Sequence, residues 1–461
     1  MSLDFSQWVS IVSDWIWGPP MLILLLGGGL FLTFRLGFFQ IRFFGHAMAQ
    51  TVGTLFKKKK REEGTLTPFQ AFSSALACTA GATNIVGVPL AIYMGGPGAL
   101  FWMWVVAVIG MATKYGEIIL GIKYREKNDQ GEWVGGPMYY IRKGLGWKPL
   151  AALFAFAMML EVIPSSMVQS NSISTTVESA FGWSTGVTGF VIMVLTAIVV
   201  LGGVKRIGRV AEQLVPFMVL GYMLAAGMIL LVYMDQLPAV FALIFEHAFT
   251  PISAVGGFSG AAVASAIRWG MARGAYSNEA GVGTAAIAHA TAQTDHPARQ
   301  GLWGIFAVFM DTIVICTLSG LVVLASGAWT QVGVDGSPAD LVPMAFGSVF
   351  GDTLGGAMVA VFLLIFALTT VGVLIYYGEK QAEYLFGLGF SKVMRIVYIL
   401  SIYVGAIGGL QFIWQFLDII LAMVVLPNMI ALLMLNKVIK AEIRDYLDNV
   451  YALEKQSRKA S

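Results

Sequence analysis

A polar stretch broken by glycine lies inside a segment that is otherwise apolar enough to cross a membrane. It runs from Ala77 to Pro89 and contains Gly81, Asn84 and Gly87. Unpaired amides and carbonyls are costly in hydrocarbon, so such backbone persists at membrane depth only where it lines a cavity walled by protein. Free amides at the start of a half-helix suit a carboxylate, and free carbonyls suit an ammonium group or Na⁺. The stretch therefore predicts a binding site, although glycines that merely let helices pack closely would give the same pattern.

The composition places the chain in one class of protein. Of its 461 residues, 57% are hydrophobic and 12% are charged, whereas a soluble domain carries about 25% charged residues. We therefore predict a polytopic membrane protein, with room for about eleven helices of about 20 residues each and none for a separate soluble domain. The two cysteines, Cys78 and Cys316, lie in apolar runs and do not indicate a disulfide framework.

Glycine, proline and charged residues delimit eleven hydrophobic segments. Residues 1–68 are expected to form a leading transmembrane helix and a basic loop. We expect this helix to be retained in the mature protein, because its start lacks the basic region of a signal peptide. The other spans are expected at 69–94, 98–122, 149–181, 186–203, 209–233, 252–290, 299–326, 341–377, 393–409 and 412–436. Each is long enough to cross a bilayer or nearly so.

The charges of the loops predict the orientation. Lys and Arg gather in the loops of one side, including the run Lys57–Arg61, whereas the other loops contain none and carry Asp235, Glu246, Asp335 and Asp340. By the positive-inside rule the basic side is cytoplasmic, so the amino terminus lies outside and the carboxyl terminus inside the cell membrane. The basic run fits anionic lipid headgroups, and we expect no nucleic-acid partner.

After the leading helix, ten spans divide into two sets of five, residues 69–251 and 252–436, followed by a cytoplasmic tail at 437–461. Because five is odd, the second set enters the membrane inverted. Each set opens with a glycine-interrupted helix, and the second contains Gly270, Gly274, Gly281 and Gly283. Matching broken helices in inverted halves indicate a secondary transporter. A channel or a membrane-embedded enzyme could share this outline, but the sequence displays neither a selectivity filter nor a catalytic constellation.

Longer motifs carry a resemblance to a known family. The stretches at 81–88, 95–104, 135–140, 273–281, 294–297 and 376–380 resemble the alanine or glycine:cation symporter family, and the match covers nearly the whole chain. The resemblance implies an all-α, leucine-transporter-like fold of the amino acid–polyamine–cation superfamily, with an extra amino-terminal helix. It also implies symport of a small amino acid with Na⁺, or sometimes H⁺, by alternating access. Such a protein is not an enzyme and uses no cofactor besides the coupling ion.

The resemblance places substrate contacts on Gly81, Thr83, Asn84, Gln169 and Trp269. Backbone amides and the Asn84 side chain could hold a carboxylate, Gln169 offers an acceptor to an ammonium group, and Trp269 could form a wall of the side-chain pocket.

The same resemblance implies that the coupling ion binds to the carbonyls of Ala77 and Ala80 and to the hydroxyls of Thr369 and Thr370. Hard oxygen ligands suit Na⁺. Paired threonines in membrane helices also commonly bond the backbone of their own helix, which is the alternative for this pair.

Two departures from the family pattern fall at the expected site. The family usually reads Gly-Thr-Gly-Asn at the first break, where this chain has Gly81-Ala82-Thr83-Asn84. It also has Ile163-Pro164-Ser165-Ser166 where the family usually reads Gly-Ile-Gly-Asn. Because both changes lie beside the expected substrate, the resemblance alone does not make alanine or glycine the substrate.

Glu161 stands in an apolar span, where a carboxylate is costly. It precedes Gln169 by eight residues, about 12 Å along a helix and on roughly the same face. We expect it to be protonated, paired with Arg268 or Arg273, or in contact with the transported ion or substrate. Glu161 could act in coupling or in the recognition of a polar or cationic side chain of the substrate. The alternatives are a structural ion pair and a position nearer the lipid interface.

The other polar residues of the spans are expected to have a structural role. Glu279, Asp311 and Asp418 are expected to lock the bundle through arginines or backbone amides rather than to couple transport. The four histidines fall in no metal-ligand spacing, so we predict no metal site beyond Na⁺.

Overall fold

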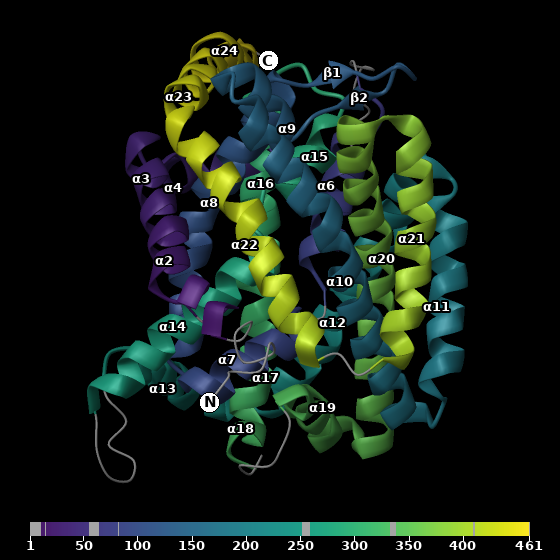
Figure 1. Cartoon of the computed structure of the whole chain (residues 1–461). Coiled ribbons are helices and arrows are strands. Elements are labelled where there is room, and N and C mark those ends of the chain that lie inside the picture. The colour runs from purple at the N-terminus through teal and green to yellow at the C-terminus, as the bar shows by residue number, and fades with distance from the viewer. Residues whose placement is uncertain are drawn as a thin grey trace.

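The computed structural model describes residues 11–13, 15–54, 64–81, 83–250, 259–331, 338–408 and 411–460. The basic run at 57–61, Ala82 and Asp335 lie outside the described residues. The described chain forms a bundle of helices that stand side by side (Figure 1). Two two-residue antiparallel strands, β1 (Glu126–Lys127) and β2 (Trp133–Val134), lie at one end of the bundle.

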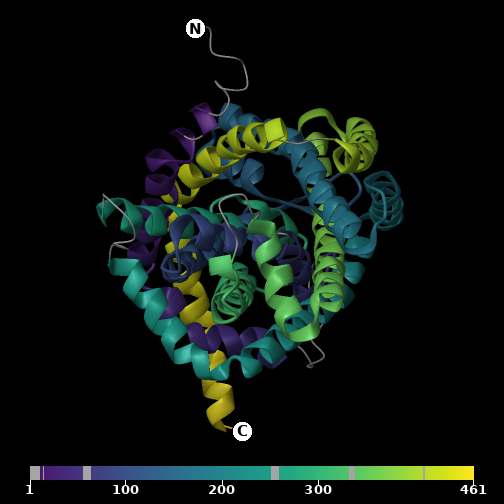
Figure 2. The same cartoon turned by 90° about the horizontal axis from the view of Figure 1, so that it is seen from below.

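The leading segment and the first set of helices follow the expected boundaries closely. The leading segment comprises α2 (Pro19–Leu22), the π-helical turn η1 (Ile23–Gly27), α3 (Gly28–Arg35), α4 (Phe39–Arg42) and α5 (Phe44–Thr51). The first set comprises α6 (Pro68–Thr79), η3 (Thr83–Gly87), α7 (Val88–Gly95), α8 (Ala99–Lys123), α9 (Pro137–Tyr140), α10 (Lys148–Phe181), α11 (Thr185–Val200), α12 (Gly203–Val232) and the peripheral α13 (Leu237–Phe249). Seen from below, the dark blue α7 lies inside a ring of other helices (Figure 2).

The second set contains the remaining helices of the bundle and is followed by the tail. Its helices are α14 (Ser259–Asn278), α15 (Thr284–Ala290), α16 (Pro297–Val308), η6 (Phe309–Cys316), α17 (Thr317–Ala325), α18 (Ala328–Gln331), α19 (Leu341–Phe350), α20 (Asp352–Phe386), α21 (Leu388–Ile407) and α22 (Gln411–Met434). The tail forms α23 (Asn436–Asp445), the π-helical turn η8 (Tyr446–Tyr451) and α24 (Ala452–Ala460). Two ion pairs of 2.7 Å, Lys123 with Glu442 and Arg299 with Glu454, hold it against the bundle.

One expected span, 341–377, was wrong. Gly351 has a φ of 84° and separates α19 from α20, and such a positive φ favours glycine because it has no side chain to clash. The long helix therefore begins at Asp352 and continues to Phe386. Hydropathy alone had merged the two because both are apolar.

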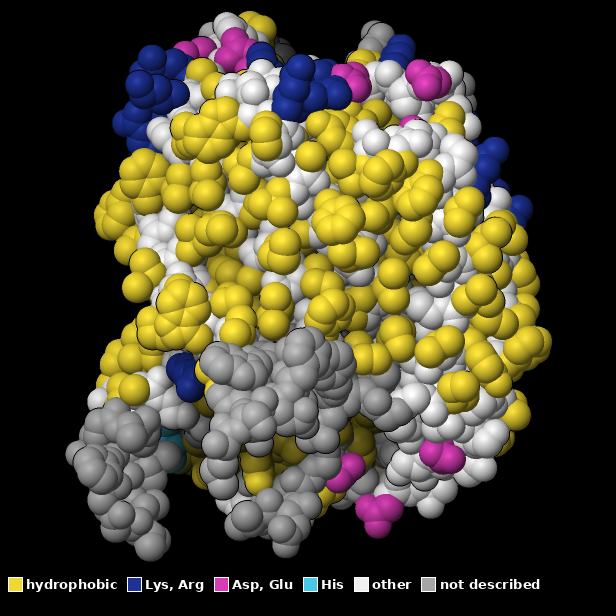
Figure 3. Space-filling view, in the orientation of Figure 1, with side chains coloured by type: hydrophobic (Ala, Val, Ile, Leu, Met, Phe, Trp, Pro, Cys, Tyr) yellow, Lys and Arg dark blue, Asp and Glu magenta, His cyan; other side chains and the backbone are white. Residues whose placement is uncertain are grey.

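The surface and the helix lengths agree with a chain that crosses a membrane. Among the described residues, seven helices are long and apolar enough to do so, and α6 with residues 83–95 forms an eighth span bent by 44°. Hydrophobic side chains cover the middle of the bundle, and Lys and Arg gather at the end where the tail lies (Figure 3). The total of eleven stays a prediction.

Two of the glycines that were expected to interrupt the second broken helix serve packing instead. Gly270 and Gly274 lie within the continuous α14. A Cβ atom at Gly270 would lie 2.2 Å from the Ala99 carbonyl oxygen, and one at Gly274 would lie 2.4 Å from a methyl carbon of Val106. The two glycines therefore let α14 approach α8 closely, as small residues do between membrane helices.

Candidate functional site

The first helix break lies where the sequence places it. The helix α6 ends at Thr79, and Ala80 leaves the helical conformation with a ψ of 88°. The Gly81 amide donates to Asn84 Oδ1 at 3.0 Å instead of continuing the helical ladder to the carbonyl four residues earlier. The Ala77 carbonyl is thereby freed, and it accepts a hydrogen bond of 2.7 Å from the Thr370 hydroxyl of α20.

Asn84 holds this break to the second half of the chain. It is fully buried, and its Nδ2 donates to Asp311 Oδ1 at 2.8 Å. The Ser277 hydroxyl of α14 donates to the other oxygen of Asp311 at 2.7 Å. The structure thus places Asn84 behind the break, where its amide positions Gly81, and not among the residues that line the cavity described below.

The second break runs between α14 and α15, where Glu279, Gly281 and Gly283 have positive φ values of 51°, 102° and 91°. The freed amides of the two glycines donate to Glu117 Oε1 of α8, at 2.8 and 3.1 Å. Asn428 of α22 donates to the same oxygen and to the Gly281 carbonyl, both at 2.8 Å. Neither Glu117 nor Asn428 was predicted from the sequence, although a carboxylate inside an apolar helix was a signal that could have identified Glu117.

Glu117→Ala should destabilise the protein because it leaves two buried amides without an acceptor. Each unpaired group costs about 1–3 kcal/mol of unfolding free energy, so the midpoint of thermal unfolding in detergent should fall clearly. Glu178→Ala, an exposed change on α10, is the control. Equal midpoints for the two variants would show that Glu117 does not hold the second break.

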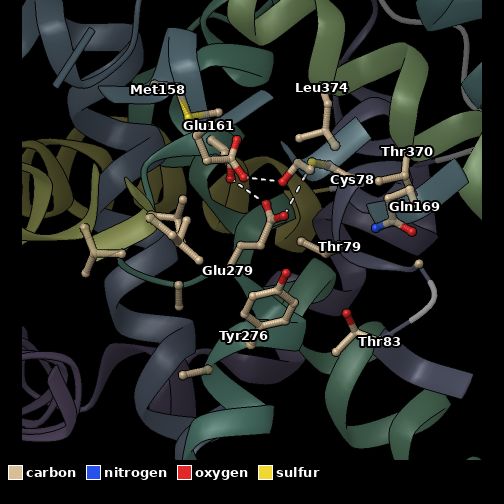
Figure 4. Close-up of a pocket in the computed structure, with 18 of the residues that line it drawn as sticks. Cys78, Thr79, Thr83, Met158, Glu161, Gln169, Tyr276, Glu279, Thr370 and Leu374 are labelled. Atoms are coloured by element: carbon tan, nitrogen blue, oxygen red, sulfur yellow. Dashed lines mark hydrogen bonds between the residues drawn. The ribbon is translucent and has the colours of Figure 1, made fainter. Parts of the chain in front are cut away.

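A cavity of about 50 Å³ lies between the two breaks (Figure 4). Gly81 and Thr83 of the first break line it together with Gln169 of α10, as the resemblance implied, and Tyr276 of α14 adds an aromatic wall. The Gln169 Oε1 atom is buried and has no hydrogen-bond partner among the described residues. An unpaired acceptor beside a helix break can receive a hydrogen bond from a ligand.

A larger cavity of about 310 Å³ adjoins this one. Both are lined by Thr83, Ser165, Gln169 and Tyr276, so these four side chains lie at the junction of the two spaces. The larger cavity extends to Arg273 and to residues of α22. A ligand that enters through it would reach the smaller cavity past this junction.

Trp269 does not line either cavity. It packs beside Gly95, where an added Cβ would lie 3.1 Å from the Trp269 Cβ, and the guanidinium groups of Arg268 and Arg273 lie 5.8 and 5.4 Å from the centre of its ring. The expected aromatic wall is provided by Tyr276, seven residues later and therefore on a similar face of the same helix.

The two threonines of α20 point in different directions. Thr370 faces the first break, and a Cβ at Gly81 would lie 3.3 Å from its hydroxyl oxygen. The Thr369 hydroxyl donates to the Phe366 carbonyl at 2.7 Å and faces Met218 of α12. Adjacent residues of a helix project about 100° apart, so the expectation that both would face the break was wrong for Thr369.

The oxygen atoms near the first break could hold a coupling ion. The Ala77 carbonyl has left the helical ladder, the Thr370 hydroxyl lies beside it, and Ala80 is the buried residue at which the helix ends. Neutral oxygen donors of this kind suit Na⁺. In the described part of the chain, no group of three or more His, Cys, Asp or Glu side chains could bind another metal ion.

Two carboxyl groups line the smaller cavity without the arginine partners that were expected. Glu161 accepts a hydrogen bond from the Ser165 hydroxyl. Glu279 accepts one from the Cys78 thiol at 3.4 Å and one from the Thr284 hydroxyl at 2.6 Å. Neither forms an ion pair with any described Lys, Arg or His. Pairing with Arg268 or Arg273 was one of the alternatives expected for each carboxyl group, and the structure does not show it, since both guanidinium groups lie beside the Trp269 ring.

Comparison with known proteins shows what the chain is similar to. A sequence model of the "Sodium:alanine symporter family" matches residues 2–460. An "Uncharacterized transporter YflA" of Bacillus subtilis is 50% identical over 452 residues, which cover 98% of this chain and 96% of the relative. The "Sodium/alanine symporter AgcS" of Methanococcus maripaludis is 43% identical over 96% of this chain and 98% of its own length.

A more distant relative and a solved structure are also similar to this chain. The "Probable sodium/glutamine symporter GlnT" of Bacillus subtilis is 36% identical over 95% of this chain and 90% of its own length. Among solved structures, MhsT in complex with L-phenylalanine superimposes with a TM-score of 0.56 at 14% sequence identity, covering 81% of this chain and 89% of the other. At that identity the likeness shows the fold, which is that of the leucine transporters.

Proposed function

The chain belongs to the sodium:alanine symporter family, and on this premise we propose that it carries a small amino acid into the cell together with Na⁺. The observation that supports the proposal most directly is the cavity between two helix breaks, one from each half of the chain. A site at the interface of inverted repeats is what alternating access requires, because either half can then open it to one side of the membrane.

The substrate contacts that we propose are Gly81, Thr83 and Gln169, with Tyr276 closing the cavity toward the larger space. The unpaired Gln169 Oε1 would accept a hydrogen bond from the substrate's ammonium group. We give Asn84 a positioning role, since its amide already binds Gly81 and Asp311.

We further propose that Na⁺ binds at the carbonyls of Ala77 and Ala80 and the hydroxyl of Thr370. An ion at this place would stabilise the broken α6 in the conformation that forms the substrate cavity. A membrane potential contributes about 2.3 kcal/mol per charge per 100 mV, which corresponds to about 50-fold accumulation of substrate for each Na⁺.

The proposed orientation puts the tail and the basic loops in the cytoplasm, as the positive-inside rule predicts. The proposed division of the chain at 68, 251 and 436 is supported at two of these points, since α6 begins at Pro68 and α23 begins at Asn436.

Counterflow in proteoliposomes tests the proposed activity. Unlabelled amino acid inside the vesicles should accelerate the entry of the same labelled amino acid, and a panel of amino acids should identify the substrate. Label that enters without acceleration would indicate a channel, and label recovered as a different compound would indicate an enzyme.

Thr83→Gly should shift selectivity toward alanine and glycine. The Thr83 side chain lines both cavities, and a β-branched residue narrows the space and restricts the backbone where the family usually has glycine. The ratio of uptake rates for alanine and for larger neutral amino acids, measured by competition, should rise. An unchanged ranking of substrates would show that residue 83 does not face the substrate.

A further inference from the structure

Two carboxyl groups from the two halves of the chain face the same small cavity. Glu161 lies on α10 of the first half and is 5% exposed, and Glu279 lies in the second break. Figure 4 shows both carboxyl groups directed into the space beside Cys78, with Met158 and Leu374 as apolar neighbours. The proposed ion site at Ala77 and Thr370 does not use either carboxyl group.

The hydrogen bonds of this pair come from neutral groups. The Ser165 hydroxyl donates to one oxygen of Glu161, and the other oxygen, Oε2, is buried with no hydrogen-bond partner among the described residues. The two oxygens of Glu279 accept from Cys78 and Thr284. No ion pair within the described ranges compensates either carboxylate.

The charged and titratable groups around Glu161 and Glu279 come from five helices. They are Cys78 of α6, Lys114 of α8, Tyr276 of α14, Tyr377 of α20 and Tyr398 of α21. Lys114 is the cation among them, and its ammonium group donates to the Asn278 carbonyl at 2.7 Å. It contributes to the field around Cys78 but makes no ion pair with either glutamate.

Two ionised carboxylates that share a low-dielectric cavity repel each other, and each lacks the solvation that water would give it. A single positive charge between them removes the repulsion and supplies the missing partner of Glu161 Oε2. The cavity volume of about 50 Å³ has room for an ion and a few water molecules, since each water needs about 10–15 Å³.

We propose that Glu161 and Glu279 form a second cation site, which carries one Na⁺ or one H⁺ with each substrate molecule. This inference rests on the proposed function of a symporter. If the cation is H⁺, a carboxylate oxygen takes the proton from water on one side of the membrane and returns it to water on the other. The site joins α10 to the second helix break, so an occupied site favours the closed cavity, and transport of substrate is thereby coupled to the cation.

The test measures the steady-state accumulation of substrate in proteoliposomes held at about 100 mV, inside negative. Glu161→Gln and Glu279→Gln each remove one carboxylate with little change in shape. Either variant should lower the ratio of internal to external substrate about 50-fold, because one charge fewer is carried with each substrate molecule. Glu178→Gln, an exposed change on the same helix, should keep the wild-type ratio.

Two further measurements identify the cation. With equal Na⁺ concentrations on both sides of the membrane, a pH gradient should drive accumulation by the wild type and not by the variants if the cation is H⁺. At fixed pH, the dependence of the ratio on the Na⁺ gradient should become less steep in the variants if it is Na⁺. Accumulation is an equilibrium quantity, so a slower variant still reports it once the steady state is reached.

The proposal is overturned if the glutamine variants reach the wild-type ratio, or if they change only the ranking of substrates, which would assign the carboxyl groups to the substrate's side chain. If a glutamine variant shows no counterflow at all, Glu161→Asp, which keeps the charge, must recover coupled accumulation, and failure to do so also overturns the proposal. Absence of counterflow in the wild type would instead refute the proposed transport function.

Discussion

Thr370→Val should raise the Na⁺ concentration needed for half-maximal uptake by about tenfold or more, or abolish Na⁺-dependent uptake. The substitution keeps the volume of the side chain but removes the hydroxyl that faces the Ala77 carbonyl at 2.7 Å. A lost oxygen ligand to a charged group corresponds to about 1.5–3 kcal/mol, which is about 10- to 150-fold in affinity. Uptake measured against Na⁺ concentration in proteoliposomes checks this result.

The neighbouring residue supplies a matched control. Thr369→Val makes the same chemical change on the same helix. Both hydroxyls lie within hydrogen-bond distance of the Phe366 carbonyl, but that of Thr369 faces α12 and not the Ala77 carbonyl. It should leave the Na⁺ activation curve unchanged. Thr370→Ser should restore much of the Na⁺ affinity because it returns the hydroxyl. Equal curves for Thr370→Val and Thr369→Val would place the coupling ion elsewhere.

Gln169→Ala should weaken binding of the substrate about 10- to 150-fold. Its Oε1 atom is buried without a partner among the described residues, and its amide nitrogen faces Gly81, where an added Cβ would lie 3.6 Å away. Loss of a hydrogen bond to a charged ammonium group costs about 1.5–3 kcal/mol. Calorimetry or the substrate-induced shift in thermal unfolding at saturating Na⁺ measures the change in Kd.

A control on the same helix is Thr175→Ala, which alters an exposed side chain that bonds only its own helix. It should bind substrate as the wild type does. If Gln169→Ala folds normally and keeps the wild-type Kd, the substrate does not contact α10 at this level, and the proposed site is refuted.

The sequence alone determined the class of protein, the position of most helices and both helix breaks. These features depend on local properties: a run of apolar residues predicts a span wherever it packs, and glycine with polar neighbours at 77–89 predicts an interruption. The family motifs added the leucine-transporter fold and placed Gly81, Thr83 and Gln169 at the cavity. Glu161 was identified because a carboxylate within an apolar helix is costly in any packing arrangement.

The tertiary structure decided which side chains of those helices meet. A helix can turn about its axis without any change in hydropathy, so the sequence did not show that Thr370 faces the break while Thr369 faces α12. Nor did it show that Tyr276 replaces Trp269 as the wall of the cavity.

The hydrogen-bond partners of buried polar groups also could not be predicted from the sequence. Glu117 binds the amides of the second break from a helix more than 160 residues earlier in the chain, and Glu279 faces Glu161 instead of an arginine. Such pairs depend on the rotation of each helix and on the distance between helices, which are set by packing of the whole bundle. Local sequence therefore located the breaks, and the packing of the two halves determined what binds within them.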